Sequence, residues 1–247
     1  MMNALTVLFR NEWGKQLARR KVLVFGVIAA LAPILLALLQ NAILPGRAIL
    51  SREDLFPTGL NLLATLIFPL MAAVLALDSF TDEIAKGSIR STLFLPAERS
   101  TIYWGKGLSA WAGSAFAIGC MWVASLLTGL FLPGRDSFLL WFGAGFASFV
   151  ASLVPMAMIV ALVMGLAQWM KSAGGILLSL VLGSMVVNLL PLLVRGVSTI
   201  LPTTWLRYGA VALSLPLSGW LAALAVLLSW TMVFGMAGWL RFEKRAF

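Results

Sequence analysis

The sequence predicts an all-α protein that crosses a membrane six times, with an amphipathic interfacial helix at its N-terminus and a short cytoplasmic helix near its middle. Three observations support this fold class. Hydrophobic residues make up 61% of the 247 residues and charged residues only 11%, whereas about 25% of the residues of a soluble domain are charged. The apolar residues form long runs, and about 20 apolar helical residues suffice to cross the hydrocarbon core. The basic residues gather at the ends of these runs.

Six apolar runs are candidate spans. No Gly/Ser linker or charge run separates a second soluble domain, so the whole chain, 1–247, is expected to form one membrane domain. The fourth run is too long for a straight crossing, and Pro155 is expected to kink it or to divide it into two pieces. The approximate ranges of the runs are 22–44, 59–80, 107–132, 138–170, 173–194 and 217–240.

Lys and Arg are distributed unequally between the two sets of connections. The N-terminal segment, the connections after the second and fourth runs, and the C-terminus hold 13 of the 18 basic residues. Because an excess of Lys and Arg marks cytoplasmic loops, both termini are expected to face the cytoplasm from a multi-pass position in the cell membrane. The other five basic residues, expected to face outward, are Arg47, Arg52, Arg135, Arg195 and Arg207.

The N-terminal segment, 1–21, has the pattern of an amphipathic helix. Leu5, Phe9, Trp13 and Leu17 recur every four residues, and basic residues occupy the other faces. This pattern is typical of a helix that lies at the cytoplasmic interface. It is imperfect, because Glu12 and Gln16 fall near the apolar arc, and a plain basic tail that only sets the topology is the alternative.

The segment 195–216 is apolar but interrupted by prolines. It also carries Arg207 between Trp205 and Tyr208. Because such a stretch is too interrupted for a clean span, it fits a re-entrant or interfacial piece on the outer side, anchored by its aromatic residues. An ordinary apolar loop is the alternative.

A charged island between the second and third runs has the design of a short helix, expected over 81–95. Thr81 is a plausible N-cap, and Asp82 and Glu83 would lie in the first turn, where negative charge complements the helix dipole. Lys86 follows Asp82 by four residues and Arg90 follows Lys86 by four. The proline after residue 95 disfavours helical geometry in the residue before it, so the helix should end there. The alternative is a solvated loop whose charges only set the topology.

The island also carries a pattern that resembles the membrane subunit of type-2 ATP-binding-cassette exporters, the ABC-2 permease family. An acidic residue is followed by Gly-Ser, a leucine, a proline, a basic residue, and a Gly-Lys that enters the next span. In this chain these are Glu83, Gly87-Ser88, Leu93, Pro96, Arg99 and Gly105-Lys106. The layout of the whole chain is similar to the small permeases of bacterial drug, lantibiotic and bacitracin export or immunity systems.

The resemblance implies a permease that exports an amphipathic or hydrophobic compound, such as a peptide antibiotic, a drug or a lipid-like molecule. It implies two partners, an ABC ATPase subunit that binds ATP and Mg and a second permease copy or related chain, so that a dimer forms the path. No cofactor or metal is expected in this chain, and no nucleic acid. The implied ATPase-coupling residues are Asp82, Glu83, Lys86, Gly87, Ser88, Arg90, Leu93, Pro96 and Arg99.

Missing residues argue against several other functions. The sequence has no G-x-x-x-x-G-K-[ST] loop, so any ATP would be bound by another chain. It has no histidine, which excludes membrane proteases of the rhomboid and zincin kinds, and one cysteine, Cys120, which forms no internal disulfide. The spans hold few ionisable groups, unlike those of ion-coupled transporters. A passive channel or facilitator, and a non-transporting assembly or sensor subunit, remain as alternatives.

Overall fold

The computed structural model describes residues 4–43, 50–85, 98–170, 172–194 and 196–244. Within these residues every regular element is a helix, and the order along the chain is simple. The long helices are α1 (Ala4–Ala18), α2 (Lys21–Ile43), α3 (Arg52–Ala64), α4 (Ile67–Ala85), α6 (Arg99–Gly129), α7 (Phe138–Trp169), α8 (Ala173–Leu193) and α10 (Leu217–Lys244). Between the last two lie the short helices η1 (Val197–Thr199), η2 (Pro202–Arg207), α9 (Tyr208–Val211) and η3 (Ala212–Ser214).

The described helices confirm an all-α polytopic membrane protein. Five of them, α2, α6, α7, α8 and α10, are long and apolar enough to cross a membrane. The sixth crossing exists only if α3 and α4 are counted together as one broken span, bent by 60°. The candidate span predicted over 59–80 thus comprises the end of α3, the break and most of α4.

The break between α3 and α4 has a local cause. Thr65 and Leu66 form a turn between the two helices, and Pro69 follows in the first turn of α4. Proline lacks an N–H, and its ring clashes with the carbonyl four residues before it, which here belongs to Thr65. The helical ladder resumes one residue later, where the Leu70 N–H donates to the Leu66 carbonyl at 3.1 Å.

Pro155 does not divide the fourth span. α7 runs as one helix from Phe138 to Trp169 with Pro155 buried inside it. It packs against α4, α6 and α10, so neighbouring helices hold both sides of the proline in place. Prolines are tolerated inside membrane helices when such neighbours support the freed backbone groups.

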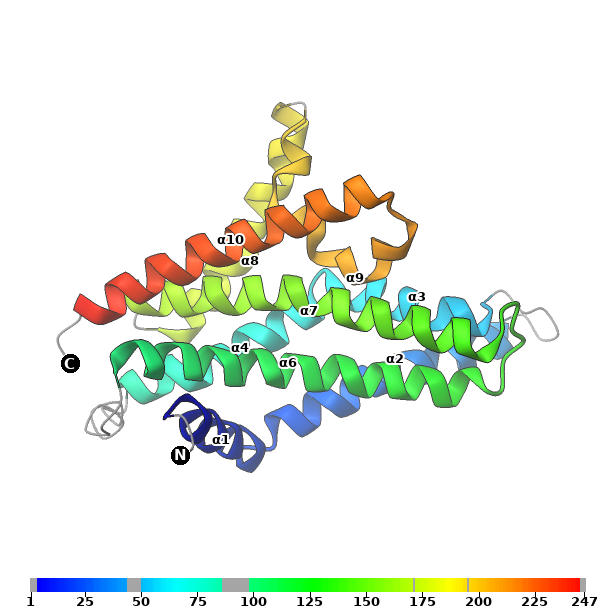
Figure 1. Ribbon diagram of the computed structural model, residues 1–247, viewed down its shortest axis with the longest axis horizontal. Helices are drawn as coiled ribbons and strands as arrows, with labels where there is room; N and C mark the ends of the chain where they lie inside the picture. The colour runs from blue at the N-terminus through cyan, green and yellow to red at the C-terminus, as the bar shows by residue number, and fades with distance from the viewer. Residues whose placement is uncertain (1–3, 44–49, 86–97, 171, 195, 245–247) are drawn as a thin grey trace.

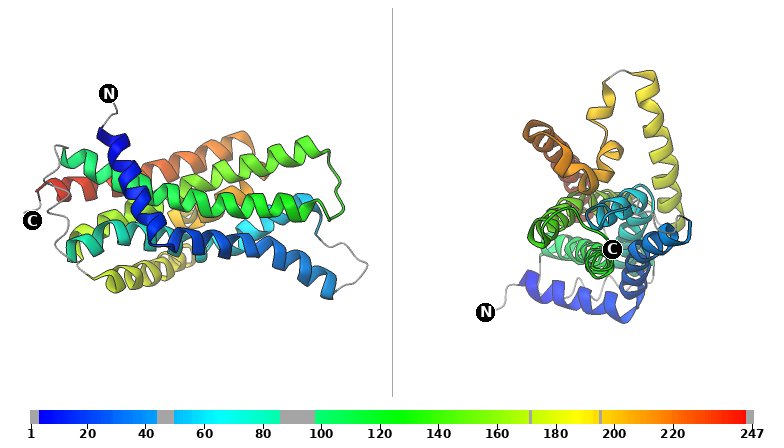
Figure 2. Two further views of the ribbon diagram at one scale, coloured as in Figure 1. Left: turned by 90° about the horizontal axis from the view of Figure 1, so that it is seen from below. Right: turned by 90° about the vertical axis from the view of Figure 1, so that its right-hand side faces the viewer.

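α6 and α7 form the centre of the bundle and run side by side along its length (Figure 1). α2 packs along α6, and α10 packs along α7. α8 stands away from the other helices over most of its length (Figures 1 and 2), and Ile176 is its one fully buried residue. Its remaining surface is available to lipid or to another protein.

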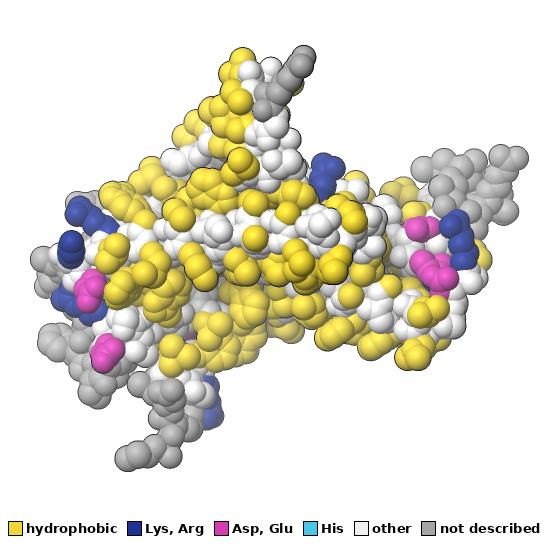
Figure 3. Space-filling model, turned by 45° about the horizontal axis from the view of Figure 1, so that its top comes forward, with side chains coloured by type: hydrophobic (Ala, Val, Ile, Leu, Met, Phe, Trp, Pro, Cys, Tyr) yellow, Lys and Arg dark blue, Asp and Glu magenta, His cyan; other side chains and the backbone are white. Residues whose placement is uncertain are grey.

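The start of α1 and the end of α10 lie at the same end of the bundle as the last turn of α4 and the first turn of α6 (Figure 1). Figure 3 shows that charged side chains gather mostly at the two ends and that hydrophobic side chains cover the surface between them. Such a surface matches a bilayer, in which an uncompensated charge is costly. The chain is therefore a multi-pass membrane protein, and the start of α1, the end of α10, the last turn of α4 and the first turn of α6 lie at one end of its bundle.

The segment before α10 packs into the bundle as short helical pieces. Tyr208 is fully buried, and its hydroxyl donates to the Trp220 carbonyl at 3.2 Å. Gly209 lies so close to α7 that a Cβ there would be 2.8 Å from the Ser148 carbonyl oxygen. The described part of this segment is thus held against α7, whereas its predicted re-entrant or interfacial placement in the membrane stays a prediction.

Candidate functional site

The first candidate site is the contact between α1 and the bundle, where α1 lies across α6 (Figure 2). Leu8, Glu12 and Gln16, spaced by four residues, form the buried face of α1. α6 lets the helix approach closely, because a Cβ at Gly105 would lie 2.5 Å from the Leu8 side chain. Small residues at helix crossings in membranes allow this kind of close packing.

A buried ion pair joins the two helices beside this crossing. The Glu12 carboxylate lies 3.1 Å from the Lys106 ammonium, and the side chains of Glu12 and Lys106 are 3% and 0% exposed. Lys15, which is nearly half exposed, also bonds Glu12 at 2.7 Å. A charge buried to this degree is tolerated when it is paired, so the Glu12–Lys106 ion pair favours the docked position of α1.

Neutral hydrogen bonds extend the contact to α4. The amide nitrogen of Gln16 donates to Ser79 on α4 at 3.1 Å and to Ser109 on α6 at 3.2 Å. The Ser109 hydroxyl in turn donates to the Lys106 carbonyl at 2.8 Å. One amide on α1 therefore connects the ends of both helices that enclose residues 86–97.

The turn after α1 adds a second ion pair to this cluster. Arg20 has a φ of +57°, in the left-handed region. It lies in the turn between the end of α1 and the start of α2. Lys21, the first residue of α2, then lies 2.8 Å from the Asp78 carboxylate on α4, and Arg19 donates to the Asp78 carbonyl at 3.1 Å. We call the set Glu12, Gln16, Lys21, Asp78, Ser79, Lys106 and Ser109 the docking cluster.

The predicted apolar stripe of α1 flanks this buried face. Leu5, Phe9, Trp13 and Leu17 are all partly buried, and Trp13 packs edge-on against Phe116 of α6. Their role at a membrane interface stays a prediction. The residues missed from sequence were Glu12 and Gln16, which fell near the apolar arc. Two polar residues four apart on an otherwise apolar face were the available signal.

The structure describes little of the charged island. α4 continues without a break through Thr81 to Ala85, so a new helix does not begin at Thr81. No proline or glycine interrupts the ladder there, and the N–H groups of the last turn find carbonyls one turn earlier. The side chains of Asp82 and Glu83 lie outside the described residues, as do the whole of Lys86, Gly87, Ser88, Arg90, Leu93 and Pro96.

Of the predicted coupling residues, the structure describes Arg99 in full and only the backbone of Asp82 and Glu83. Arg99 is the first residue of α6, and its guanidinium donates to the Glu243 carbonyl near the end of α10 at 2.9 Å. Behind it, Tyr103, Phe80 and Phe242 pack as an aromatic cluster between α6, α4 and α10. The start of α6 is thus fixed to α10 as well as to α1.

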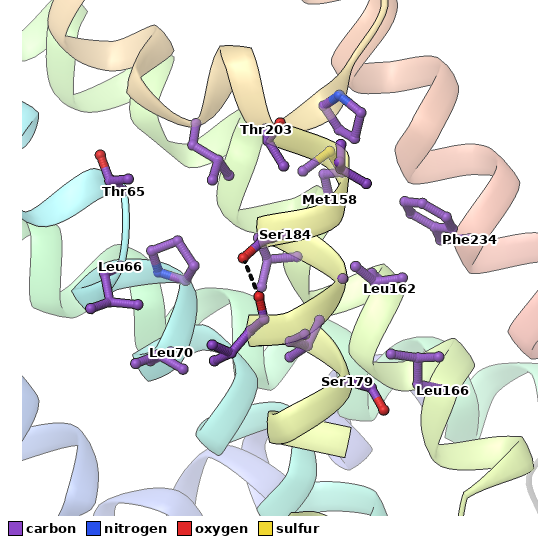
Figure 4. Close-up of a pocket in the computed structure, with 18 residues that line it drawn as sticks. Thr65, Leu66, Leu70, Met158, Leu162, Leu166, Ser179, Ser184, Thr203 and Phe234 are labelled. Carbon is purple, nitrogen blue, oxygen red and sulfur yellow. Dashed lines mark hydrogen bonds between the residues drawn. The ribbon is translucent and has the colours of Figure 1, made fainter. Parts of the chain in front are cut away.

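The second candidate site is an apolar cavity of about 320 Å³, shown in Figure 4. Its walls come from the α3–α4 break, α7, α8, η2 and Phe234 of α10. Four hydroxyl groups reach it, and three have partners. Arg207 donates to Thr65 at 2.9 Å, and Ser179 and Ser184 donate to carbonyls of their own helix. The hydroxyl oxygen of Thr203 is buried and has no partner within the described structure.

The fold and these two sites define a multi-pass helical membrane protein with a polar contact at one end and an apolar cavity among its helices. Residues 8–187, well over half of the chain, match the family described as ABC-2 family transporter protein, and no curated protein matches. The chain belongs to this ABC-2 family. It is therefore a membrane component of a transport system rather than an enzyme, and the family implies an ABC ATPase subunit as partner.

Proposed function

We propose that the chain is the membrane-spanning permease subunit of an ATP-driven exporter in the cell membrane. The chain has no phosphate-binding loop, so ATP and Mg would be bound and used by a separate ATPase subunit. The proposed cargo is an amphipathic or hydrophobic compound, such as a peptide antibiotic, a drug or a lipid-like molecule, exported for resistance or immunity. A second permease copy or related chain would complete the path. The exposed surface of α8 leaves space for such a chain to pack.

The docking cluster is the observation that carries the coupling part of this proposal. Residues 86–97 connect α4 to α6, and the cluster joins the ends of these two helices to α1 and α2. A displacement of the connection by an ATPase would therefore act on four helices together. In this proposal both termini and the connection face the cytoplasm, as the excess of Lys and Arg in these segments predicts.

Co-expression of Glu83→Lys with the cognate ATPase tests the proposal. The matched control is Asp136→Lys, because Asp136 is an exposed acid in the connection at the opposite end of the bundle. Reversing a charge that is desolvated on docking costs about 2–5 kcal/mol. We expect Glu83→Lys to reach the membrane normally but to lose co-purification of the ATPase and cargo-stimulated hydrolysis, whereas Asp136→Lys keeps both.

Two outcomes would contradict the proposal. Unchanged complex formation, coupling and transport in Glu83→Lys would leave the island as a charged loop. Cargo flux through the purified chain without any ATPase would instead favour the passive facilitator.

A further inference from the structure

The apolar cavity lies where two interrupted elements of the chain meet. One is the α3–α4 break at Thr65 and Leu66, and the other is η2, which contributes Pro202, Thr203 and Leu206. Figure 1 shows both part-way along the bundle rather than at an end. Non-helical backbone at membrane depth is tolerated where it is buried in protein or lines a cavity, and transporters place ligand sites at discontinuous helices.

The lining selects an uncharged occupant. None of the described lining residues is charged, and apart from four hydroxyl groups the walls are apolar. The nearby guanidinium of Arg207 is bonded to Thr65. An ionised group inside the cavity would therefore lose its hydration without gaining a counter-ion, which is costly. An alkyl chain has no polar group to desolvate when it enters the cavity.

Thr203 supplies the polar end of the site. Figure 4 shows its hydroxyl group beside the cavity, on the wall that η2 forms. This buried oxygen lacks a hydrogen-bond partner in the described structure, and a buried polar atom without a partner is unfavourable. A ligand oxygen at the end of an apolar chain would satisfy it.

Size and access agree with a small ligand from the bilayer. About 320 Å³ is near the lower end of the roughly 300–1,000 Å³ found for small-molecule pockets. One wall is α8, of which Ile176 is the one fully buried residue, so a molecule dissolved in the bilayer would enter the cavity along this helix. We propose that the cavity binds the uncharged alkyl chain of a single-chain amphiphile, with Thr203 bonding the oxygen at its end. This inference rests on the proposed function, since it makes that amphiphile the exported compound.

Two glycines give a matched pair of variants. A Cβ at Gly183, on the α8 wall of the cavity, or at Gly143, on the exposed surface of α7, would meet no heavy atom within 4 Å. Gly183→Leu is therefore expected to add a bulky side chain at the cavity wall, and Gly143→Leu adds the same side chain elsewhere. Thr203→Val removes the hydroxyl and keeps the shape of the side chain.

The test uses the full chain in lipid nanodiscs and three photoactivatable diazirine probes: a long-chain alcohol, the matching alkane, and a phosphatidylcholine with the same chain. We expect the alcohol to label cavity residues such as Leu162, Val187 and Phe234 saturably. Gly183→Leu should reduce its affinity by about tenfold or more, and Gly143→Leu should not. Thr203→Val should lower the affinity for the alcohol by about two- to tenfold and leave the affinity for the alkane unchanged.

Other results would overturn the inference. The first is equal labelling of the parent and of Gly183→Leu by the alcohol. The second is an equal change in the labelling by alcohol and by alkane in Thr203→Val. The third is saturable labelling by phosphatidylcholine alone, which would indicate an ordinary lipid contact. The labelling needs no ATPase, so its failure is separate from a failure of the Glu83→Lys coupling experiment. In the assembled transporter, Gly183→Leu should also abolish stimulation of hydrolysis by the alcohol while ATPase co-purification persists.

Discussion

The Glu12 carboxylate on α1 lies 3.1 Å from the Lys106 ammonium on α6, and both side chains are almost completely buried. The same carboxylate bonds Lys15 at 2.7 Å, but Lys15 is nearly half exposed. Glu12 therefore has one buried and one exposed cationic partner. This difference separates the contribution of burial from that of charge pairing.

Replacing Glu12 should break its buried ion pair with Lys106. We expect Glu12→Leu to destabilise the protein by about 3–5 kcal/mol, whereas the double variant Glu12→Leu/Lys106→Met should recover most of that loss, since apolar replacement of a whole buried pair is often neutral. Thermal unfolding of the purified protein measures the change. Lys15→Met is the control, and an exposed pair of this kind is worth about 0–1 kcal/mol. Equal effects of Glu12→Leu and Lys15→Met would show that burial of the pair is unimportant.

The crossing of α7 and α10 should not tolerate a side chain at Gly238. A Cβ there would lie 2.8 Å from the Cα of Gly165 and 3.1 Å from its nitrogen, so the two backbones would have to separate. Overpacking of this kind costs about 1–3 kcal/mol. Gly238→Ala should therefore lower the unfolding midpoint.

Gly219, near the start of the same helix, is the control for Gly238. A Cβ at Gly219 would make only ordinary contacts, the nearest at 3.5 Å from Pro216. Because alanine favours a helix over glycine by about 1 kcal/mol, Gly219→Ala should be neutral or stabilising. A stable Gly238→Ala protein would contradict the close approach of α7 and α10.

Cysteine labelling in a Cys120→Ser background tests the orientation of the chain. Arg10, Arg135 and Lys244 are exposed. The connection between α6 and α7, which holds Arg135, lies at the opposite end of the bundle from the start of α1 and the end of α10 (Figure 1). A membrane-impermeant maleimide added to intact cells should modify Arg135→Cys at once. Arg10→Cys and Lys244→Cys should react only after the membrane is opened. Labelling of position 10 from outside would reverse the proposed topology.

Most of the fold could be predicted from the sequence because its cause is local. A long apolar run must cross the bilayer as a helix, since backbone groups there find no water. α7, α8 and α10 accordingly begin at residues 138, 173 and 217, where the predicted spans begin. An even number of crossings also agrees with the start of α1 and the end of α10 lying at one end of the bundle (Figure 1).

The sites depend on contacts that the sequence pattern does not contain. Lys106 looked like a topogenic charge beside a span, yet it is buried, because α1 brings Glu12 to it from 94 residues earlier in the chain. Pro69 is visible in the sequence, but whether a proline breaks a helix depends on its neighbours, and Pro155 lies in an unbroken one. The cavity exists because α8 leaves the bundle beside the α3–α4 break. Hydrophobicity along the chain determined which segments enter the membrane, and only the packing of those segments decided which polar groups meet and where space remains between them.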